Sequence, residues 1–222
     1  MLMLGAPLSL PAADHEPGAW GAIALTGPVK LGGKNTRWQW YADAQARYLD
    51  TDPGIRQALI RPALGYAVSK DLSLWAGYAW RHLDASGRES LDEHRLWQDI
   101  NWTTPVRSQS KLNLRSRIEQ RWISGFNDVG WRFRQLVKLQ RSLTANPDIS
   151  AIISNDLFIS LNDTDWNQRS GFDQNRFFVG AAIRIGARTF VQAGYLNQYL
   201  DRPQGNSLMA HIAQAGIRYK FD

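Results

Sequence analysis

Hydrophobic and polar residues alternate along most of the chain, and this pattern predicts strands rather than helices. Between residues 36 and 48, every second position carries an aromatic residue or alanine, and the positions between them are mainly polar or charged. A helix would place Trp38 and Trp40 on different faces, whereas a strand places both on one face. Residues 111–122 repeat the pattern, with Lys, Asn, Arg and Glu on one parity. A period of two residues is typical of strands whose two faces differ in polarity.

Turn residues divide the chain into ten alternating segments. They cover approximately residues 36–49, 55–68, 71–83, 93–104, 110–123, 130–142, 149–161, 175–186, 189–201 and 208–221. Short connections, such as 69–71 and 146–148, alternate with longer polar ones, such as 84–92 and 162–174. This arrangement is typical of membrane barrels, and strands of this length suit a tilted membrane crossing. We therefore predict an all-β fold, an antiparallel transmembrane up-and-down β-barrel of ten strands, with twelve as the alternative count.

The amino-terminal region divides into three predicted parts. Residues 1–13 are apolar and end in small residues, which indicates the remnant of a truncated signal peptide. Residues 14–35 are either a leader segment or an extra strand, and residues 36–222 form the barrel. Bacterial single-chain barrels normally have an even number of strands. With both termini on the periplasmic side, ten strands from residue 36 onward satisfy that rule.

Aromatic residues on the apolar parity gather near the two ends of the predicted strands. This aromatic girdle contains Trp38, Trp40, Trp80, Trp102, Trp122, Trp131, Tyr199, Tyr219 and Phe221. Two such bands match the interfacial girdles of outer-membrane barrels. Between them, the residues predicted to face lipid are Ala44, Ile60, Leu114, Ile118, Val137 and Val179. A soluble barrel of the lipocalin kind is the alternative, but the strand length and the arginine-rich polar face favour the membrane barrel.

Charged residues on the opposite parity are predicted to form a charge network in the lumen. Its members are Glu93, Arg95, Asp99, Arg115, Arg117, Glu119, Arg121, Arg132, Arg134 and Asp156. The assumed register places Trp102 opposite Leu112, Trp122 opposite Trp131 and Gln140 opposite Ser150. The resulting pairs are Asp99–Arg115, Arg95–Glu119, Glu93–Arg121, Glu119–Arg134 and Arg134–Asp156. In a narrow lumen with little water, an unpaired charge would cost several kcal/mol.

Some inward-facing cations lack an obvious partner in this register: Arg37, Arg47, Arg61, Arg117, Arg132 and Lys138. One interpretation is that the charges fill and hold a small barrel. The other is a water-filled constriction that favours anions.

Composition restricts the possible chemistry. Lys and Arg number 26 against 20 Asp and Glu, but arginine is spread through nearly every segment, so nucleic acid is not an expected partner. The absence of cysteine excludes disulfides, thiolate metal sites and a cysteine nucleophile. The four histidines do not have the spacing of a metal motif. We therefore predict no cofactor and no metal site.

Several short motifs resemble the uncharacterised bacterial outer-membrane β-barrel family classed as a domain of unknown function. They are Gly77-Tyr78, the segments 93–98, 115–121 and 131–134, Asn155-Asp156, the segments 172–176 and 194–198, and His211. The similarity covers roughly residues 37–221. The resemblance implies the barrel fold and the bacterial outer membrane, and it implies no activity.

The predicted function is that of an outer-membrane barrel that acts as a narrow or plugged channel or as a structural barrel. One alternative is an outer-membrane enzyme that modifies lipid or lipopolysaccharide, with His82 and His94 near Ser86 or Ser90 at one rim. Another is a binding barrel that uses its extracellular loops, residues 84–92 and 162–174. Catalysis is the less favoured interpretation. The expected partners of this monomer are outer-membrane lipids, lipopolysaccharide and the outer-membrane assembly machinery.

Overall fold

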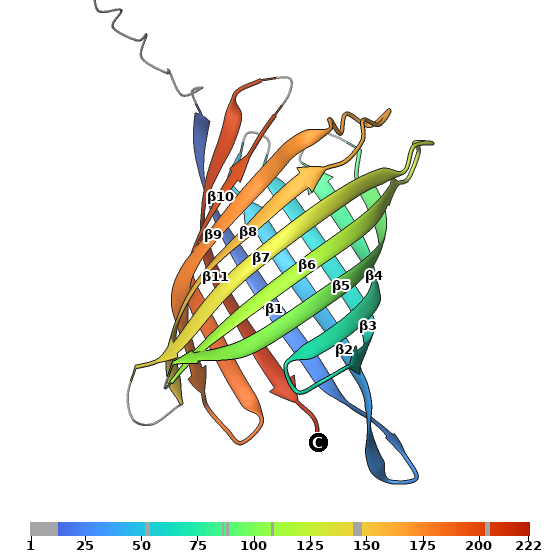
Figure 1. Cartoon of the computed structure of the whole chain (residues 1–222). Helices are drawn as coiled ribbons and strands as arrows, with labels where there is room; N and C mark the ends of the chain where they lie inside the picture. Colours follow the sequence, from blue (N-terminus) through green and yellow to red (C-terminus); the bar gives the residue numbers. More distant parts are fainter. Residues whose placement is uncertain are drawn as a thin grey trace, which may run out of the picture.

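The computed structural model describes residues 13–51, 54–85, 87, 89–107, 109–143, 148–202 and 205–222. Eleven strands form one closed barrel (Figure 1). They are β1 (Ala13–Leu31), β2 (Lys34–Leu49), β3 (Ile55–Ala67), β4 (Leu72–Ala85), β5 (Leu91–Arg107), β6 (Ser110–Ile123), β7 (Gly130–Ser142), β8 (Ile149–Ser160), β9 (Gly171–Arg184), β10 (Thr189–Leu200) and β11 (Ser207–Lys220). Within the described residues, no helix is long and apolar enough to cross a membrane.

Each strand pairs with its neighbours in sequence in the antiparallel sense, and the predicted all-β barrel is confirmed. The barrel has eleven strands, whereas ten or twelve were predicted. The additional strand comes from residues 14–35, predicted as a leader or an extra strand, which form most of β1 and the turn into β2. β1 closes the barrel by pairing in parallel with β11, with Trp20 opposite Gln214. One parallel pair lets an odd number of strands close, so the even-count rule does not apply here. Residues 1–12 of the predicted signal peptide lie outside the described part of the chain.

The two ends of the barrel differ in their connections. β1 begins at the end that carries the longer connections, which we call the distal end (Figure 1). Lys220 ends β11 at the opposite, basal end, where the short turns lie (Figure 1). The expectation that both termini share one end is therefore wrong for the ends of the described barrel. An odd number of strands places the first and the last strand end on opposite sides.

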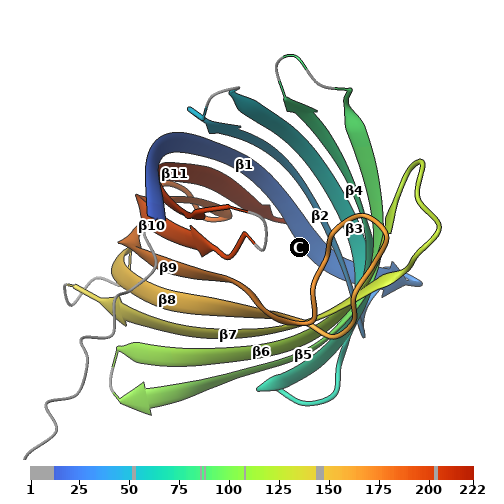
Figure 2. The same cartoon turned by 90° about the horizontal axis from the view of Figure 1, so that it is seen from above.

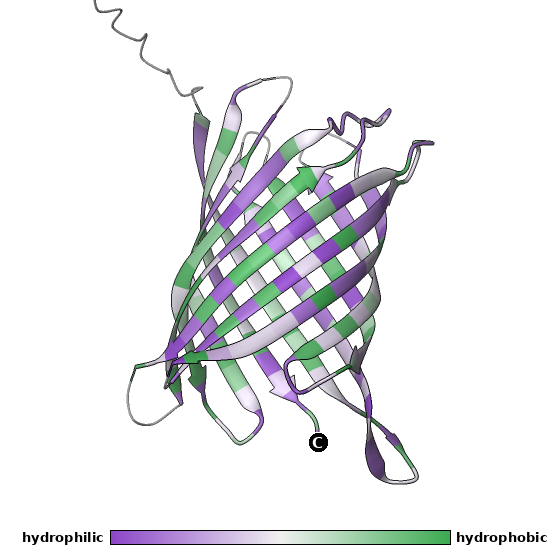
Figure 3. Ribbon diagram, in the orientation of Figure 1, coloured by the Kyte–Doolittle hydropathy of each residue, from purple (hydrophilic) through white to green (hydrophobic). Residues whose placement is uncertain are grey.

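Hydrophilic and hydrophobic residues alternate along many of the strands (Figure 3), and buried residues alternate with more exposed ones. In β5, Glu93, Arg95, Trp97 and Asp99 are buried, whereas Leu96 between them is exposed. In a barrel made of one sheet, the face shielded from water is the inner one. The parity that was read from the sequence therefore matches the burial pattern of these strands.

The registers differ from those assumed, and each differs by two residues. Trp102 lies opposite Leu114, Trp131 opposite Gln120, and Gln140 opposite Ile152. In the first hairpin, β5 continues through Pro105, and the turn is made near Gln109, whose φ of 67° lies in the left-handed region. A shift of two residues changes the partners but keeps every side chain on its original face.

Candidate functional site

The charged residues predicted for the lumen are brought together within the barrel. All ten take part in ion pairs, nine of them are buried and Arg115 is half-buried. Arg81 and Asp173 join them. These twelve residues, seven arginines and five carboxylates, are called the ion-pair cluster below. Three of the five predicted pairs form, namely Glu93–Arg121, Glu119–Arg134 and Arg134–Asp156.

Glu119 of β6 is the acceptor at the centre of one half of the cluster, and only 1% of it is exposed. Arg132 donates to its Oε2 from Nε at 2.9 Å and from Nη2 at 2.5 Å, and Arg134 Nη1 donates to Oε1 at 2.8 Å. Arg117 Nη1 lies 3.6 Å from the same Oε1. Such charge-assisted bonds are about twice as strong as neutral ones. One buried carboxylate therefore holds three arginines from two strands.

Glu93 of β5 is the acceptor at the centre of the other half of the ion-pair cluster. Arg95 donates to both carboxylate oxygens at 2.8 Å, Arg121 Nε lies 2.5 Å from Oε1, and Arg81 Nη2 lies 2.6 Å from Oε2. The predicted pair between Arg95 and Glu119 is replaced by this pair within β5. The shift in register moves Glu119 opposite Trp97 and away from Arg95.

Two further predicted positions change partner for the same reason. Asp99 accepts from Arg117 at 2.5 and 2.7 Å instead of from Arg115, and Arg115 pairs with Asp156 at 3.2 Å. The guanidinium of Arg117 also lies 3.8 Å from the centroid of the Trp97 ring. A side chain at Gly77 would collide with that indole, so Gly77 gives Trp97 its space inside the barrel.

Sequence reasoning missed several residues around the cluster. Arg81 lies on the predicted inner parity of β4 and could have been found from that parity. Trp20 lies in the segment predicted as a leader or an extra strand, and it was not predicted to contact the charged interior. Its ring lies 4.3 Å from the guanidinium carbon of Arg47 and 4.9 Å from that of Arg176. Of the other cations thought to be unpaired, Arg61 donates to Asp43 at 2.8 and 2.5 Å. Arg37 is exposed near the basal end.

The connection between β8 and β9, residues 161–170, reaches across the distal opening (Figure 2). Buried Gln168 accepts from Arg121 at 2.9 Å, and the Trp166 ring lies 4.9 Å from the guanidinium carbon of Arg121. The backbone N–H of Ser170 donates to Asp163 at 2.7 Å, which holds the pKa of Asp163 below its ordinary value. A cavity of about 150 Å³ remains between this connection and Arg121.

On the other side of the interior, apolar side chains replace the charges. Phe178, Leu196, Leu208 and Ile212 are buried in one cluster together with Leu49, and Trp20 packs against it. These residues come from β2, β9, β10 and β11. Between the two ends, the described interior therefore has the ion-pair cluster on one side and mainly apolar side chains on the other.

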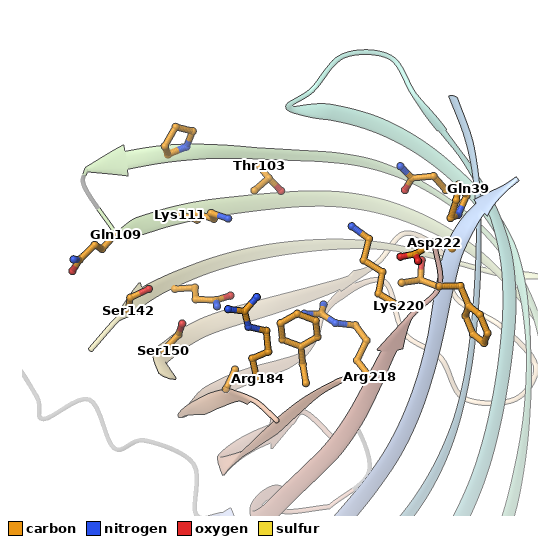
Figure 4. A pocket seen from close by; sticks show the side chains of 18 of the residues that line it. Gln39, Thr103, Gln109, Lys111, Ser142, Ser150, Arg184, Arg218, Lys220 and Asp222 are labelled. Atoms are coloured by element: carbon orange, nitrogen blue, oxygen red, sulfur yellow. The ribbon is translucent and has the colours of Figure 1, made fainter. Parts of the chain in front are cut away.

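A larger cavity of about 1340 Å³ opens at the basal end, and we call it the basal cavity (Figure 4). Arg107, Lys111, Arg218 and Lys220 line it from β5, β6 and β11. No carboxylate of the described residues lies within ion-pair distance of these four cations. The basal cavity shares no lining residue with the cavity of about 150 Å³ near Arg121, which we call the distal cavity. Along β6, the ion-pair cluster lies between them.

The predicted girdle residues fall into two groups by exposure. Trp38, Trp102, Trp131 and Phe221 are exposed, and the others are half-buried: Trp40, Trp80, Trp122, Tyr199 and Tyr219. Near the basal end, the Phe221 ring lies 5.2 Å from that of Trp40 and 4.7 Å from that of Tyr219. Contact of these rings with lipid headgroups stays a prediction.

The histidines proposed for catalysis have other partners. His82 Nδ1 lies 2.8 Å from Asp92 Oδ1, and His94 Nδ1 lies 2.5 Å from the hydroxyl of Tyr78. Ser86 lies outside the described residues. In the part of the chain that the structure describes, no hydrogen bond joins either histidine to a serine. No group of three or more His, Asp or Glu side chains is placed there to hold a metal ion.

This geometry defines the class: a β-barrel of one closed sheet whose interior is filled by ion pairs and apolar side chains. Residues 17–209 match the family described as "Protein of unknown function (DUF2490)", and the chain belongs to that family. The predicted membership of a domain of unknown function is thus confirmed. The chain is also similar to an uncharacterised protein of Methylorubrum extorquens AM1, with 38% identity over 184 residues, which cover 82% of this chain and 80% of the relative.

Proposed function

We propose that this chain is an outer-membrane β-barrel protein whose arginine-rich lumen is occluded, so that it serves as a plugged channel or a structural barrel. The observation that carries the proposal is the combination of an apolar outer face with a buried, ion-paired interior. Soluble barrels have the opposite arrangement, with polar side chains outside and apolar ones inside. Membrane barrels place apolar residues toward lipid and polar residues toward the lumen.

The outer face supports the membrane placement. Ile60, Ile100, Val137 and Val179 point outward from β3, β5, β7 and β9, and each is between 43% and 56% exposed. They belong to a much larger set of exposed aliphatic and aromatic side chains distributed around the barrel. A soluble monomer rarely exposes apolar surface on this scale. In a membrane the same residues would contact lipid chains, and the exposed aromatic residues would lie near the headgroups and lipopolysaccharide.

The interior supports the occlusion. Side chains commonly fill the lumen of a small barrel. Here Glu93, Glu119 and their arginines lie between the two cavities, and the β8–β9 connection adds Gln168 at the distal end. Charges in so dry a place must be paired, because an isolated one costs several kcal/mol. The same pairing holds the strands together and blocks the path of a solute.

Single cysteines can test the membrane placement, since the chain has none of its own. Val137→Cys places a thiol on the outer face of β7, and Gln140→Cys places one on the inner face of the same strand, in the basal cavity. Each variant is labelled with an environment-sensitive dye and refolded into vesicles that contain brominated lipid. We expect a blue-shifted, quenched signal at position 137 and a water-like, unquenched signal at position 140. Equal quenching at both positions, or none at 137, would contradict the proposal.

The proposal extends to partners. A barrel of this kind would be inserted as a monomer by the outer-membrane assembly machinery, and lipopolysaccharide and outer-membrane lipids would surround it. Cell fractionation tests this part: the chain should appear in the outer-membrane fraction and should depend on that machinery. Recovery from the soluble fraction would contradict it.

A further inference from the structure

We propose that the basal cavity is a binding site for an anionic oligosaccharide, a ligand that carries several carboxylate or phosphate groups on a hydroxyl-rich scaffold. This goes beyond the occluded barrel and does not depend on its placement in a membrane. The site would be a cup, closed toward the ion-pair cluster and open at the basal end. A ligand would therefore enter and leave by the same mouth.

The first argument is the charge of the cavity wall. Lys111 of β6 and Arg218 and Lys220 of β11 line it (Figure 4), and Arg107 lines it from β5. Among the described residues that line it, Asp222 is the single carboxylate, and Asp222 is paired with Arg188. In the sequence, residues 108 and 144–147, which the structure does not describe, are Ser, Thr, Ala, Asn and Pro. Among the described residues, the four cations therefore have no carboxylate within ion-pair distance, and an anionic ligand would supply one.

The second argument is the exposure of these cations. All four are exposed, in contrast to the arginines of the ion-pair cluster. A hydrated cation that faces a cavity can exchange water for a ligand oxygen without first breaking an internal ion pair. Hydrogen bonds from a charged donor are stronger than those between neutral groups. Several such bonds from spaced cations select a ligand with spaced negative groups.

The third argument is the chemistry between the cations. Amide side chains such as Gln39 and Gln109 and hydroxyls such as Ser142 and Thr103 complete the wall (Figure 4). Amides and hydroxyls both donate and accept hydrogen bonds, as sugar hydroxyls do. The Phe190 ring adds an apolar face, and the guanidinium carbon of Arg218 lies 5.3 Å from its centroid. The cavity volume of about 1340 Å³ exceeds the 300–1,000 Å³ typical of sites for drug-sized molecules, so it suits an oligomer.

The fourth argument is the charge difference between the two ends. The basal turns carry cations such as Lys34 and Lys70, whereas the distal connections carry carboxylates such as Asp128, Asp165 and Asp201. The field of such a charge distribution raises the local concentration of anions at the basal end and lowers it at the distal end. An anionic ligand would thus be guided to the mouth of the cavity.

The test measures binding by isothermal titration calorimetry to the full chain in a neutral detergent. The anionic probe is a hexamer of galacturonate, and the matched neutral probe is maltohexaose. We expect the galacturonate hexamer to bind, with an affinity that falls as salt is added, and maltohexaose to bind at least about tenfold more weakly. Equal affinity for the two probes, or no binding of the anionic one, would overturn the proposal.

The variants locate the site. Lys111→Gln with Lys220→Gln removes two charges from the cavity, and Arg56→Gln with Arg169→Gln removes two exposed charges from the distal end, outside the cavity. We expect the first pair to raise the Kd by about tenfold or more and the second pair to change it less than about twofold. Loss of binding in both double variants, or in neither, would show that the cavity is not the site.

The same chemistry could come from a free glycan or from a lipid headgroup. The titration is therefore repeated in nanodiscs of phosphatidylcholine alone and in nanodiscs that contain phosphatidylglycerol. If the galacturonate hexamer binds more weakly in the discs that contain phosphatidylglycerol, and if the Lys111→Gln, Lys220→Gln variant shows no such difference between the two discs, the site is assigned to headgroups. Equal binding in the two discs would assign it to a soluble glycan.

Discussion

Strand β6 contributes charged residues to two regions, and these residues are buried and ion-paired in one region and exposed in the other. Near its distal part, Arg117 and Glu119 are buried, and each is held in ion pairs. Near its beginning, Lys111 lies on the same face of the same strand, but it is exposed in the basal cavity, and no carboxylate of the described residues pairs with it. Access of water is the difference between the two regions.

In the ion-pair cluster, removal of water makes an unpaired charge expensive, and each carboxylate is paired with at least one arginine, Glu93 and Glu119 with three each. In the basal cavity, water solvates the cations and no partner is required. Charge pairing in this barrel thus follows hydration along the strand. The buried charges stabilise and fill the interior, and the hydrated ones remain available for binding.

The largest effect is expected for Glu119→Gln. The change leaves Arg132, Arg134 and Arg117 facing one another without their shared carboxylate. Removing one partner of a buried ion pair typically costs about 3–5 kcal/mol, and we expect a loss of this size in the free energy of unfolding. Urea unfolding of the protein refolded in vesicles measures it. Glu89→Gln, an exposed carboxylate of the β4–β5 connection, is the control and should change stability by less than about 0.5 kcal/mol. A loss below about 1 kcal/mol at position 119 would remove the energetic distinction between the two regions.

The next effect is expected on the outer face. Val137→Arg places a cation where the proposal has lipid, which should destabilise the folded barrel by about 2–4 kcal/mol near the bilayer midplane. Gln140→Arg on the same strand is the control, because position 140 faces the water of the basal cavity. Urea titration in vesicles should show a large shift for the first variant and a small one for the second. A small shift for Val137→Arg and a large one for Gln140→Arg would mean that position 137 faces the interior and position 140 faces lipid.

A smaller effect is expected for Lys111→Gln. Because Lys111 has water rather than a carboxylate around it, the free energy of unfolding should change by no more than about 0.5 kcal/mol. The comparison with Glu119→Gln is direct, since both positions lie on the inner face of β6. Urea unfolding of the wild type and of both variants, measured under the same conditions, checks this expectation. A destabilisation above about 1 kcal/mol would reveal an internal partner for Lys111 and weaken the case for ligand binding.

The smallest effect concerns the β8–β9 connection and pH. The hydrogen bond from Ser170 lowers the pKa of Asp163 in the folded protein, so its contribution is present at neutral pH and is lost as the pH falls through that lowered value. We expect hydrogen exchange at the Ser170 amide to accelerate, after correction for intrinsic rates, only below the ordinary aspartate pKa of about 3.9. Asp163→Asn should remove this dependence. Protection that is unchanged at low pH in the wild type would show that Asp163 does not order the connection.

The closed all-β barrel and the faces of its strands could be read from the sequence, because a two-residue period survives errors in register. Individual pairs could not be read reliably. Pro105 resembles a turn residue but remains inside β5, and this moves Glu119 from Arg95 to Trp97. Arginine is long enough to reach a diagonal neighbour, which is why Arg134 still meets both Glu119 and Asp156.

β1 was harder to recognise as part of the barrel. Its sequence contains Pro17, Gly18, Gly21 and Pro28, which weaken the alternation that marks a strand. Its place depends on a parallel pairing with β11 at the far end of the chain, and no local pattern reveals such a pairing. The basal cavity was missed for a related reason, since Arg218 and Lys220 of β11 are distant in sequence from Arg107 and Lys111, which β5 and β6 contribute.

Conductance across a planar bilayer tests most directly the claim that the ion-pair cluster seals the interior while the basal cavity stays open to water. The wild-type protein is inserted, and its folding is verified by heat-modifiable migration. We expect no steady conductance step above the bare bilayer, because the two cavities share no lining residue and the ion-pair cluster lies between them along β6. Stable, ohmic conductance by the folded wild-type barrel would contradict the account.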